Sequence, residues 1–167
     1  LMEPMTEVSR MREKQSHDRA QLDALLDSTP LVTIALIRDG HPVALPIGFA
    51  RIGDELVIHG STGSPWLREL AAGAPASASV TMLDGIVVAR SGFESSFQDR
   101  SAVLFGSFTA VAAESKNRYL SMLVDHFIPG RSAELRGSTG KELAATLVLT
   151  MPITGDNWSL KVSGAWP

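Results

Sequence analysis

A short run of small polar residues is the first place where this sequence could do chemistry. His59-Gly60-Ser61-Thr62-Gly63-Ser64 follows the strand-like run 55–58 and precedes 65–72, where apolar residues recur with helical spacing. Ser64 is a typical N-cap and Pro65 suits the first helical position, so a strand leads through this loop into a helix. Free N–H groups and hydroxyls at the positive end of a helix dipole suit an anion such as phosphate. An ordinary capped helix after a strand would have the same sequence, and that alternative stays open.

Three cations and one histidine are further candidates for such a site. Arg51 ends an expected strand, where its guanidinium could neutralise a phosphate, and Arg100 ends a polar segment with two phenylalanines. Lys161 lies on the last expected strand. Each has a second interpretation. Arg51 could be a solvated arginine at a strand end, and Arg100 could belong to a surface loop with salt bridges. Lys161 could protect a sheet edge. His59 could contact a phosphate or a ring, or it could only fill the mouth of a barrel.

The composition excludes several other classes of site. The 167 residues include no cysteine, which excludes disulfides, thiolate metal sites and cysteine nucleophiles, and the four histidines have no ligand spacing, so no metal site is expected. The formal net charge of -3 gives no general attraction to nucleic acid or to an anionic membrane. No apolar run is long enough to span a bilayer, and the N-terminus lacks a signal-peptide core. We therefore expect a cytoplasmic protein with neither a nucleic-acid nor a membrane partner.

The segment Gly137–Lys141 resembles part of a P-loop, but two of the required residues are missing. Leu135 stands where the first glycine belongs, and Glu142 replaces the hydroxyl residue. A polar turn before a short helix is the better interpretation. The loop after His59 likewise lacks the G-x-S-x-G spacing of a serine hydrolase.

Apolar periodicity and turn signals predict the elements that position these residues. Residues 1–17 are charged and aperiodic and are expected to form a flexible arm, followed by one domain over residues 18–167. Asp84-Gly85 is expected to turn a hairpin, and Gly106 to bend a long strand. Helices are predicted from Asp18 to about Leu26 and at 65–72, 116–127 and about 141–145. Strands are predicted at 31–37, 42–51, 55–58, 76–82, 86–90, 102–111, 146–151 and 158–162. The result is a mainly β (α+β) fold, in which short helices flank an antiparallel sheet that closes into a barrel.

The chain resembles the flavin-nucleotide-binding branch of the pyridoxamine 5′-phosphate oxidase-like family, which has a six-stranded antiparallel split β-barrel. The most specific match is the stretch VTMLDGIVVARS at residues 80–91. The resemblance covers about residues 19–163, nearly the whole chain. Other segments that carry it are Pro42–Pro46, Arg51, Gly53–Ser61, Arg100–Gly106, Pro129–Arg131, Glu142–Thr146 and Ser159–Val162.

The resemblance implies a homodimer with FMN in two clefts at the subunit interface. The flavin ring would lie along residues 46–50, the phosphate would be held by Arg51 and the loop after His59, and Arg100-Ser101 and Lys161 would come from the partner chain. The implied function is an FMN-binding oxidoreductase, a flavoprotein that transfers hydride or electrons between a reduced nicotinamide and a small acceptor. The expected cofactor-binding residues are Pro46, Ile47, Gly48, Phe49, Ala50, Arg51, His59, Gly60, Ser61, Thr62, Ser64, Arg100, Ser101 and Lys161.

Two departures from the family pattern keep other functions open. Relatives often have a lysine or arginine where Pro65-Trp66 begins the helix, so a cation is missing from the phosphate site. Relatives also tend to have histidines and a tyrosine within the segment 93–101, and here those proton donors are gone. No catalytic residue is therefore assigned. The alternatives are a non-catalytic flavin- or haem-binding module and a structural dimer without flavin.

Overall fold

The computed structural model describes residues 5–163, and in this range nine strands form one antiparallel sheet. The strand order is β1-β9-β6-β5-β2-β3-β4-β8-β7. The mainly β class with flanking short helices is confirmed, with nine strands in place of six. The strands are β1 Gln15–Ser16, β2 Leu31–Arg38, β3 His41–Ile52, β4 Glu55–Ser61, β5 Ala76–Val87, β6 Ser96–Gly106, β7 Thr109–Ala110, β8 Thr146–Pro152 and β9 Trp158–Val162. The helices are α1 Arg19–Asp27, α2 Pro65–Ala71, α3 Lys116–Phe127 and α4 Gly140–Ala144, with short 3-10 turns η1 Arg12–Lys14, η2 Ala113–Ser115 and η3 Arg131–Glu134.

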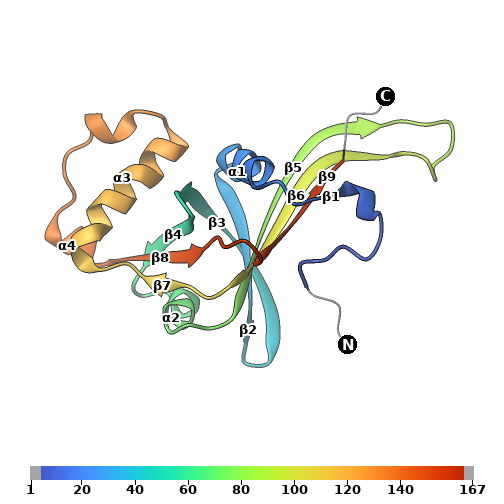
Figure 1. Ribbon diagram of the computed structural model, residues 1–167. Helices are drawn as coiled ribbons and strands as arrows, with labels where there is room; N and C mark the ends of the chain where they lie inside the picture. The colour runs from blue at the N-terminus through green and yellow to red at the C-terminus, as the bar shows by residue number, and fades with distance from the viewer. Residues whose placement is uncertain (1–4, 164–167) are drawn as a thin grey trace.

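The chain passes from one half of the sheet to the other within β3 and again between β6 and β7, and so curls the sheet into a split barrel. β3 pairs with β2 through residues 41–48 and with β4 through residues 49–52. Residues 102–111 are expected from the sequence to form one strand bent at Gly106, but β6 ends at Gly106 and the chain then forms β7 against β8. Figure 1 shows α3 and α4 beside β4 and β8 at one end, while the β5–β6 hairpin extends from the other. No helix in residues 5–163 has the length and apolarity needed to cross a bilayer.

The main core lies between α1 and one face of the sheet. Asp18 caps α1 by accepting a hydrogen bond from the Ala20 N–H at 2.9 Å, as predicted. Leu22, Leu25 and Leu26 are fully buried against the side chains that alternate inward along β2 and β5. This alternation of buried and open side chains gives each strand a core face and an opposite face.

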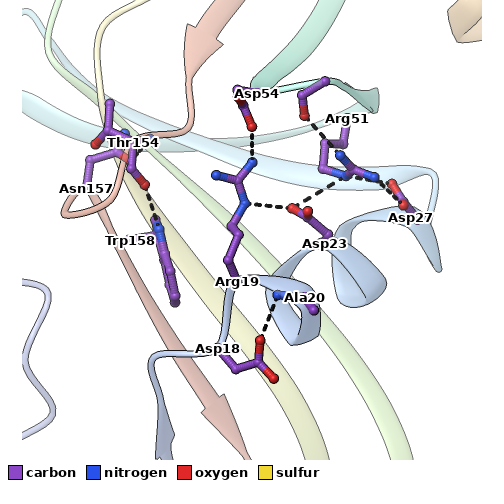
Figure 2. A network of polar contacts seen from close by, with 11 residues as sticks. Asp18, Arg19, Ala20, Asp23, Asp27, Arg51, Asp54, Thr154, Asn157 and Trp158 are labelled. Carbon is purple, nitrogen blue, oxygen red and sulfur yellow. Dashed lines mark hydrogen bonds and ion pairs between the residues drawn. The ribbon is translucent and has the colours of Figure 1, made fainter.

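Ion pairs tie α1 to the β3–β4 turn, as Figure 2 shows. The Arg19 guanidinium contacts Asp23 at 2.8 Å and Asp54 at 2.7 Å. The Arg51 guanidinium contacts Asp27 at 2.6 Å and donates to the Gly53 carbonyl at 2.9 Å. These contacts fix the helix on the sheet in addition to its buried leucines.

Asp84-Gly85 lies within a strand, so the prediction of a hairpin turn there is wrong. β5 runs on to Val87, and its register with β6 shifts between Leu83 and Gly85, which makes Asp84 the extra residue of a β-bulge. The hairpin loop is at residues 88–95, and the predicted strand 86–90 is the end of β5 and the start of this loop. The Asp-Gly pair suits a bulge as well as a turn, and the local sequence does not distinguish them.

The N-terminal segment is partly joined to the sheet. Within residues 5–17, η1 leads to β1, which pairs Gln15 with Lys161 and Ser16 with Leu160 of β9. The remainder of the expected arm, residues 1–4, and the last residues of the expected domain, 164–167, lie outside the described residues.

Candidate functional site

The strands β2, β3, β5, β6 and β9 share a face that lies opposite the core, and several of the predicted site residues lie on it. Cross-strand partners point to the same side of a sheet, so the register defines this open face. One row runs Pro46, Thr33, Ser79, Val103 and Ser159. None of these side chains is buried, and none is charged.

A second row of the open face carries Thr81, Ser101, Lys161 and Gln15. Ser101 and Lys161 are half-buried, and no ion pair of Lys161 is found among residues 5–163. Within the described part of the chain, Lys161 is therefore an unpaired cation on a face with several hydroxyl side chains. Pro46 lies four strands away, which corresponds to about 19 Å at the usual strand spacing. A single chain does not bring Pro46 and Lys161 to the same small ligand.

Only part of the expected ring segment, residues 46–50, is open. Phe49 is fully buried, Ala50 is 1% exposed, and Ile47 packs on the main core. Phe127 of α3 covers Gly48 so closely that a Cβ there would lie 3.1 Å from the Phe127 ring. Pro46 is the exposed side chain of this segment.

Arg51 lies at the other end of β4 from the predicted phosphate loop. It pairs with Leu56, so Ser61 is five residues, or about 16 Å, further along the strand. Its guanidinium is held by Asp27, with an Nη2–Oδ2 distance of 2.6 Å and an Nε–Oδ1 distance of 3.0 Å. The hydrogen bond to Asp27 raises the pKa of Arg51 further above its ordinary value. In this chain Arg51 joins α1 to β3 through its ion pair with Asp27, and it does not lie next to the loop after β4.

Arg100 and Ser101 face opposite sides of β6, because successive residues of a strand alternate. Ser101 lies on the open face, whereas Arg100 forms two hydrogen bonds of 2.8 Å to the carboxylate of Asp84 in the β5 bulge. These bonds lower the pKa of the Asp84 carboxyl below its usual value. Of the expected cations, Lys161 is unpaired and Arg100 is paired.

The loop after β4 uses its own backbone donors, contrary to the expectation that they are free. The Thr62 N–H donates to the Ala145 carbonyl at 2.9 Å, and the Gly63 N–H donates to the Ser61 hydroxyl at 3.0 Å. The Ser64 N–H donates to the Ser61 carbonyl at 3.0 Å. α2 does begin at Pro65 as predicted, but the Ser64 side chain makes no capping hydrogen bond. The Thr62 hydroxyl also donates to the Ala145 carbonyl, at 3.2 Å. What this loop can offer an anion is therefore the Ser61 and Ser64 hydroxyls and any cation beside it.

Arg68 is that cation, and the sequence prediction missed it. Its Nη1 lies 3.5 Å from the Thr62 carbonyl oxygen, and no ion pair of its exposed side chain is found in the described part of the chain. Helical side chains tilt toward the helix N-terminus, so an arginine one turn inside α2 can reach back to the loop. This tilt is the signal that could have identified Arg68. The Arg68 guanidinium brings a positive charge to the loop, where Pro65-Trp66 has none.

His59 and Gly60 are neighbours that face opposite ways. A Cβ on Gly60 would lie 2.3 Å from the Leu67 side chain, so glycine here lets α2 pack against β4. His59 shares its side with Val148, its partner on β8, in a small core beneath α3. Burial lowers the pKa of His59, and its buried Nδ1 has no hydrogen-bond partner among residues 5–163. His59 therefore sits as a neutral ring away from the Gly60 side.

The segment that resembles part of a P-loop is a helix cap, which agrees with its interpretation as a polar turn before a short helix. The Thr139 hydroxyl accepts from the Glu142 N–H, and the Glu142 carboxylate accepts from the Thr139 N–H at 2.8 Å. Glu142 also pairs with Arg136, and these contacts lower its pKa to about 2. The segment therefore has a structural role in starting α4.

Comparisons with known proteins agree with this architecture. The sequence matches the Pyridoxamine 5′-phosphate oxidase family over residues 18–156. The chain is 69% identical to the FAD- and haem-binding protein from Mycobacterium smegmatis, with a TM-score of 0.90 over 92% of this chain and 75% of that chain. It is 32% identical to the flavocytochrome Anf3 from Azotobacter vinelandii, with a TM-score of 0.89 over 97% of this chain and 75% of that chain.

More distant structures share the fold alone. A FAD-binding protein from Mesorhizobium loti is 14% identical, with a TM-score of 0.60 over 88% of this chain and 96% of that chain. No curated protein matches the sequence. The length of the family match and the identity to two solved relatives lead to one conclusion: this chain belongs to the pyridoxamine 5′-phosphate oxidase-like family of split barrels.

Proposed function

We propose that the protein is a flavin-dependent oxidoreductase that works as a homodimer, with the flavin held between the open faces of two copies. The observation that carries this proposal is the 69% identity, over 92% of the chain, to a protein that binds FAD and haem. The site residues described above would bind the part of the flavin that FMN and FAD have in common. A bound flavin would supply the hydride and electron transfer, from a reduced nicotinamide to a small acceptor.

The composition of the open face supports the homodimer. A sheet face exposed to water normally carries several charged side chains, yet the first row of this one carries none and the second carries only Lys161. At its margins Leu31, Ile37, Leu83 and Phe97 are each more than half exposed. Exposed apolar side chains at the margins of a face with few charges favour an interaction site, and a second copy offers the matching surface.

The unpaired cations support the binding of a flavin nucleotide. Arg68 and the hydroxyls of the loop after β4 would hold the phosphate, since Arg51 is already paired with Asp27. Lys161 of the other subunit would face the ring and stabilise the negative charge that reduction places on a flavin. Arg100 is less suited to this role because Asp84 neutralises it.

The test is an absorption spectrum of the freshly purified protein, followed by identification of what is released on denaturation. We expect an oxidised-flavin spectrum and turnover of reduced nicotinamide with quinone or nitro acceptors well above that of free flavin. A colourless protein that fails to bind added FMN and FAD would overturn the proposal. Bound flavin without turnover across a broad acceptor panel would leave a binding module and overturn the enzyme assignment.

A second candidate is a flavin- and haem-binding module, which the similarity to a FAD- and haem-binding protein and to a flavocytochrome favours. His41, at the β2–β3 turn, is our candidate ligand for the iron of a haem. Its Nδ1 donates to the Asp39 carbonyl at 2.8 Å, which leaves Nε2 of this exposed ring as a free ligand in the described part of the chain. We expect His41→Ala to lose a Soret band while it keeps flavin absorbance. An unchanged Soret band would remove His41 from the haem site.

A further inference from the structure

The open face contains a cavity of about 320 Å³ on the β5–β6 hairpin, lined by Thr81, Leu83, Phe97 and Asp99. Leu83 is the cross-strand partner of Asp99, and Phe97 lies two residues from Asp99 along β6, so these side chains share one side of the hairpin. Thr81 belongs to the same row of the open face as Lys161, two strands away. The cavity is therefore part of the open face and begins about 10 Å from Lys161 at the usual strand spacing.

Asp99 is the one carboxylate that the described residues of β2, β3, β5, β6 and β9 place on the open face. Its Oδ1 accepts a hydrogen bond from the Ser163 hydroxyl at 3.0 Å. No ion pair of Asp99 is found among residues 5–163, and its Oδ2 has no donor in that range. This oxygen is therefore available to a donor that a ligand supplies.

The lining fits a flat ring that carries an amide group. Leu83 is 57% exposed and Phe97 is 59% exposed, so their apolar surface is open to the faces of a ring. A carboxylate only accepts hydrogen bonds, so Asp99 favours an amide N–H and disfavours quinone and nitro oxygens, which are acceptors themselves. The Thr81 hydroxyl can donate to the carbonyl of the same amide. The volume suits a single ring, at the lower end of small-ligand pockets.

We propose that this cavity receives the nicotinamide ring of the reduced electron donor and that Asp99 recognises its carboxamide. Leu83 and Phe97 would hold the ring. The carboxamide N–H would donate to Asp99, and its carbonyl would accept from Thr81. The inference rests on the proposed function, in which Lys161 faces the flavin ring held by the partner subunit. A donor ring in a cavity close to Lys161 would then lie near that flavin.

The test compares two electron donors with the flavin-loaded, full-length protein and a quinone acceptor. One is reduced nicotinamide adenine dinucleotide, and the other is its acetylpyridine analogue, in which a methyl group replaces the amide nitrogen. Asp99→Ala should lower kcat/KM about tenfold for the nicotinamide donor and no more than twofold for the analogue, because only the first has an N–H group to lose. Asp99→Asn keeps a neutral acceptor oxygen and should recover most of the loss.

A binding measurement gives a readout that does not depend on turnover. Calorimetric titration with the unreactive tetrahydro derivative of the nicotinamide donor should show a dissociation constant about tenfold higher for Asp99→Ala than for the wild type. Phe97→Ala should weaken both donors alike in the kinetic assay, since contacts with the ring do not depend on the amide. Glu94→Ala, which removes an exposed carboxylate from the loop of the same hairpin, is the matched control and should behave as the wild type does.

The outcomes separate this inference from the proposed function. Equal losses for the two donors in Asp99→Ala, or no loss for either, would overturn the role of Asp99 and leave the oxidoreductase proposal intact. A protein that binds flavin but oxidises neither donor would overturn the nicotinamide site and leave flavin binding intact. Failure to bind flavin would overturn the proposed function, and the inference with it. Each variant should keep the wild-type circular dichroism spectrum, because these substitutions leave the backbone pairing of β5 and β6 unchanged.

Discussion

The two faces of the same strands differ in what their side chains are suited to do. On β2, Val32, Ile34 and Leu36 are 4% exposed or less and pack on α1 and the inner strands, whereas Leu31 and Ile37, on the other face, are 60% and 64% exposed. The core face is closed within one chain. The open face has few charges, and no other segment of residues 5–163 buries it, which is why we propose that it meets a second copy.

The largest effect is expected where the core face is broken. Phe49→Ala removes a fully buried ring that packs near His126 and should lower the free energy of unfolding by about 3–5 kcal/mol. Urea unfolding monitored by circular dichroism measures this change. Phe97→Ala, which removes a 59% exposed ring on the open side of the hairpin, is the matched control and should cost far less. Equal losses in the two variants would contradict the distinction between the faces.

The next effect is expected at the centre of the open face. Thr33→Lys places a charge between Pro46 and Ser79, and in a two-fold dimer it would bury two unpaired ammonium groups. An unpaired charge in an interface costs about 2–5 kcal/mol, so the dimer should dissociate while each chain stays folded. Size-exclusion chromatography with light scattering measures the mass. Thr33→Ser should remain a dimer, and a Thr33→Lys dimer as tight as the wild type would show that another face is used.

A smaller effect on flavin affinity is expected to distinguish Arg68 from Arg51, which is paired with Asp27. Arg68→Ala should raise the dissociation constant for FMN about tenfold, because one charge-assisted contact to the phosphate is worth about 1.5 kcal/mol. Riboflavin, which has no phosphate, should bind as before. Arg51→Ala should instead lower the free energy of unfolding by about 1 kcal/mol through loss of the Asp27 pair, with FMN affinity within twofold. Weaker FMN binding by Arg51→Ala and unchanged binding by Arg68→Ala would instead assign Arg51 to the phosphate site.

The smallest effect is a pH dependence that arises from His59. Burial lowers the pKa of His59 in the folded protein below its ordinary value of 6.5, so below this pH the unfolded chain binds the proton more readily. Stability from this group is complete above pH 6.5 and is lost as the pH falls, by at most about 1.4 kcal/mol per pH unit. Urea unfolding of the wild type and of His59→Leu at pH 7.5 and 5.5 measures it. The slope in this window should be smaller in the variant, and identical slopes would exclude His59 as its source.

Local patterns predicted most of the elements and little of the geometry of the site. The leucines of α1, the cap at Asp18 and the start of α2 follow from periodicity and from cap chemistry, which are local properties. The bulge at Asp84 does not, because the same dipeptide serves turns and bulges, and the choice depends on pairing with a distant strand.

The partners of the cations depend on the fold in a way that local sequence does not reveal. Arg51 and Asp27 are 24 residues apart, and only the packing of α1 against β3 joins them. Which residues face each other across strands is equally a property of register. That Ser101 and not Arg100 lies on the open face follows only once the pairing with β5 and β9 is known. Arg68 is the exception, since the tilt of helical side chains could have identified it from sequence.

Native mass spectrometry of the freshly purified protein is the most direct test of the central claim that two open faces hold flavin between them. The account predicts a homodimer that carries two flavin nucleotides, and loss of both flavins when Thr33→Lys separates the chains. A monomer that retains flavin, or a dimer that neither carries nor accepts it, would contradict this claim.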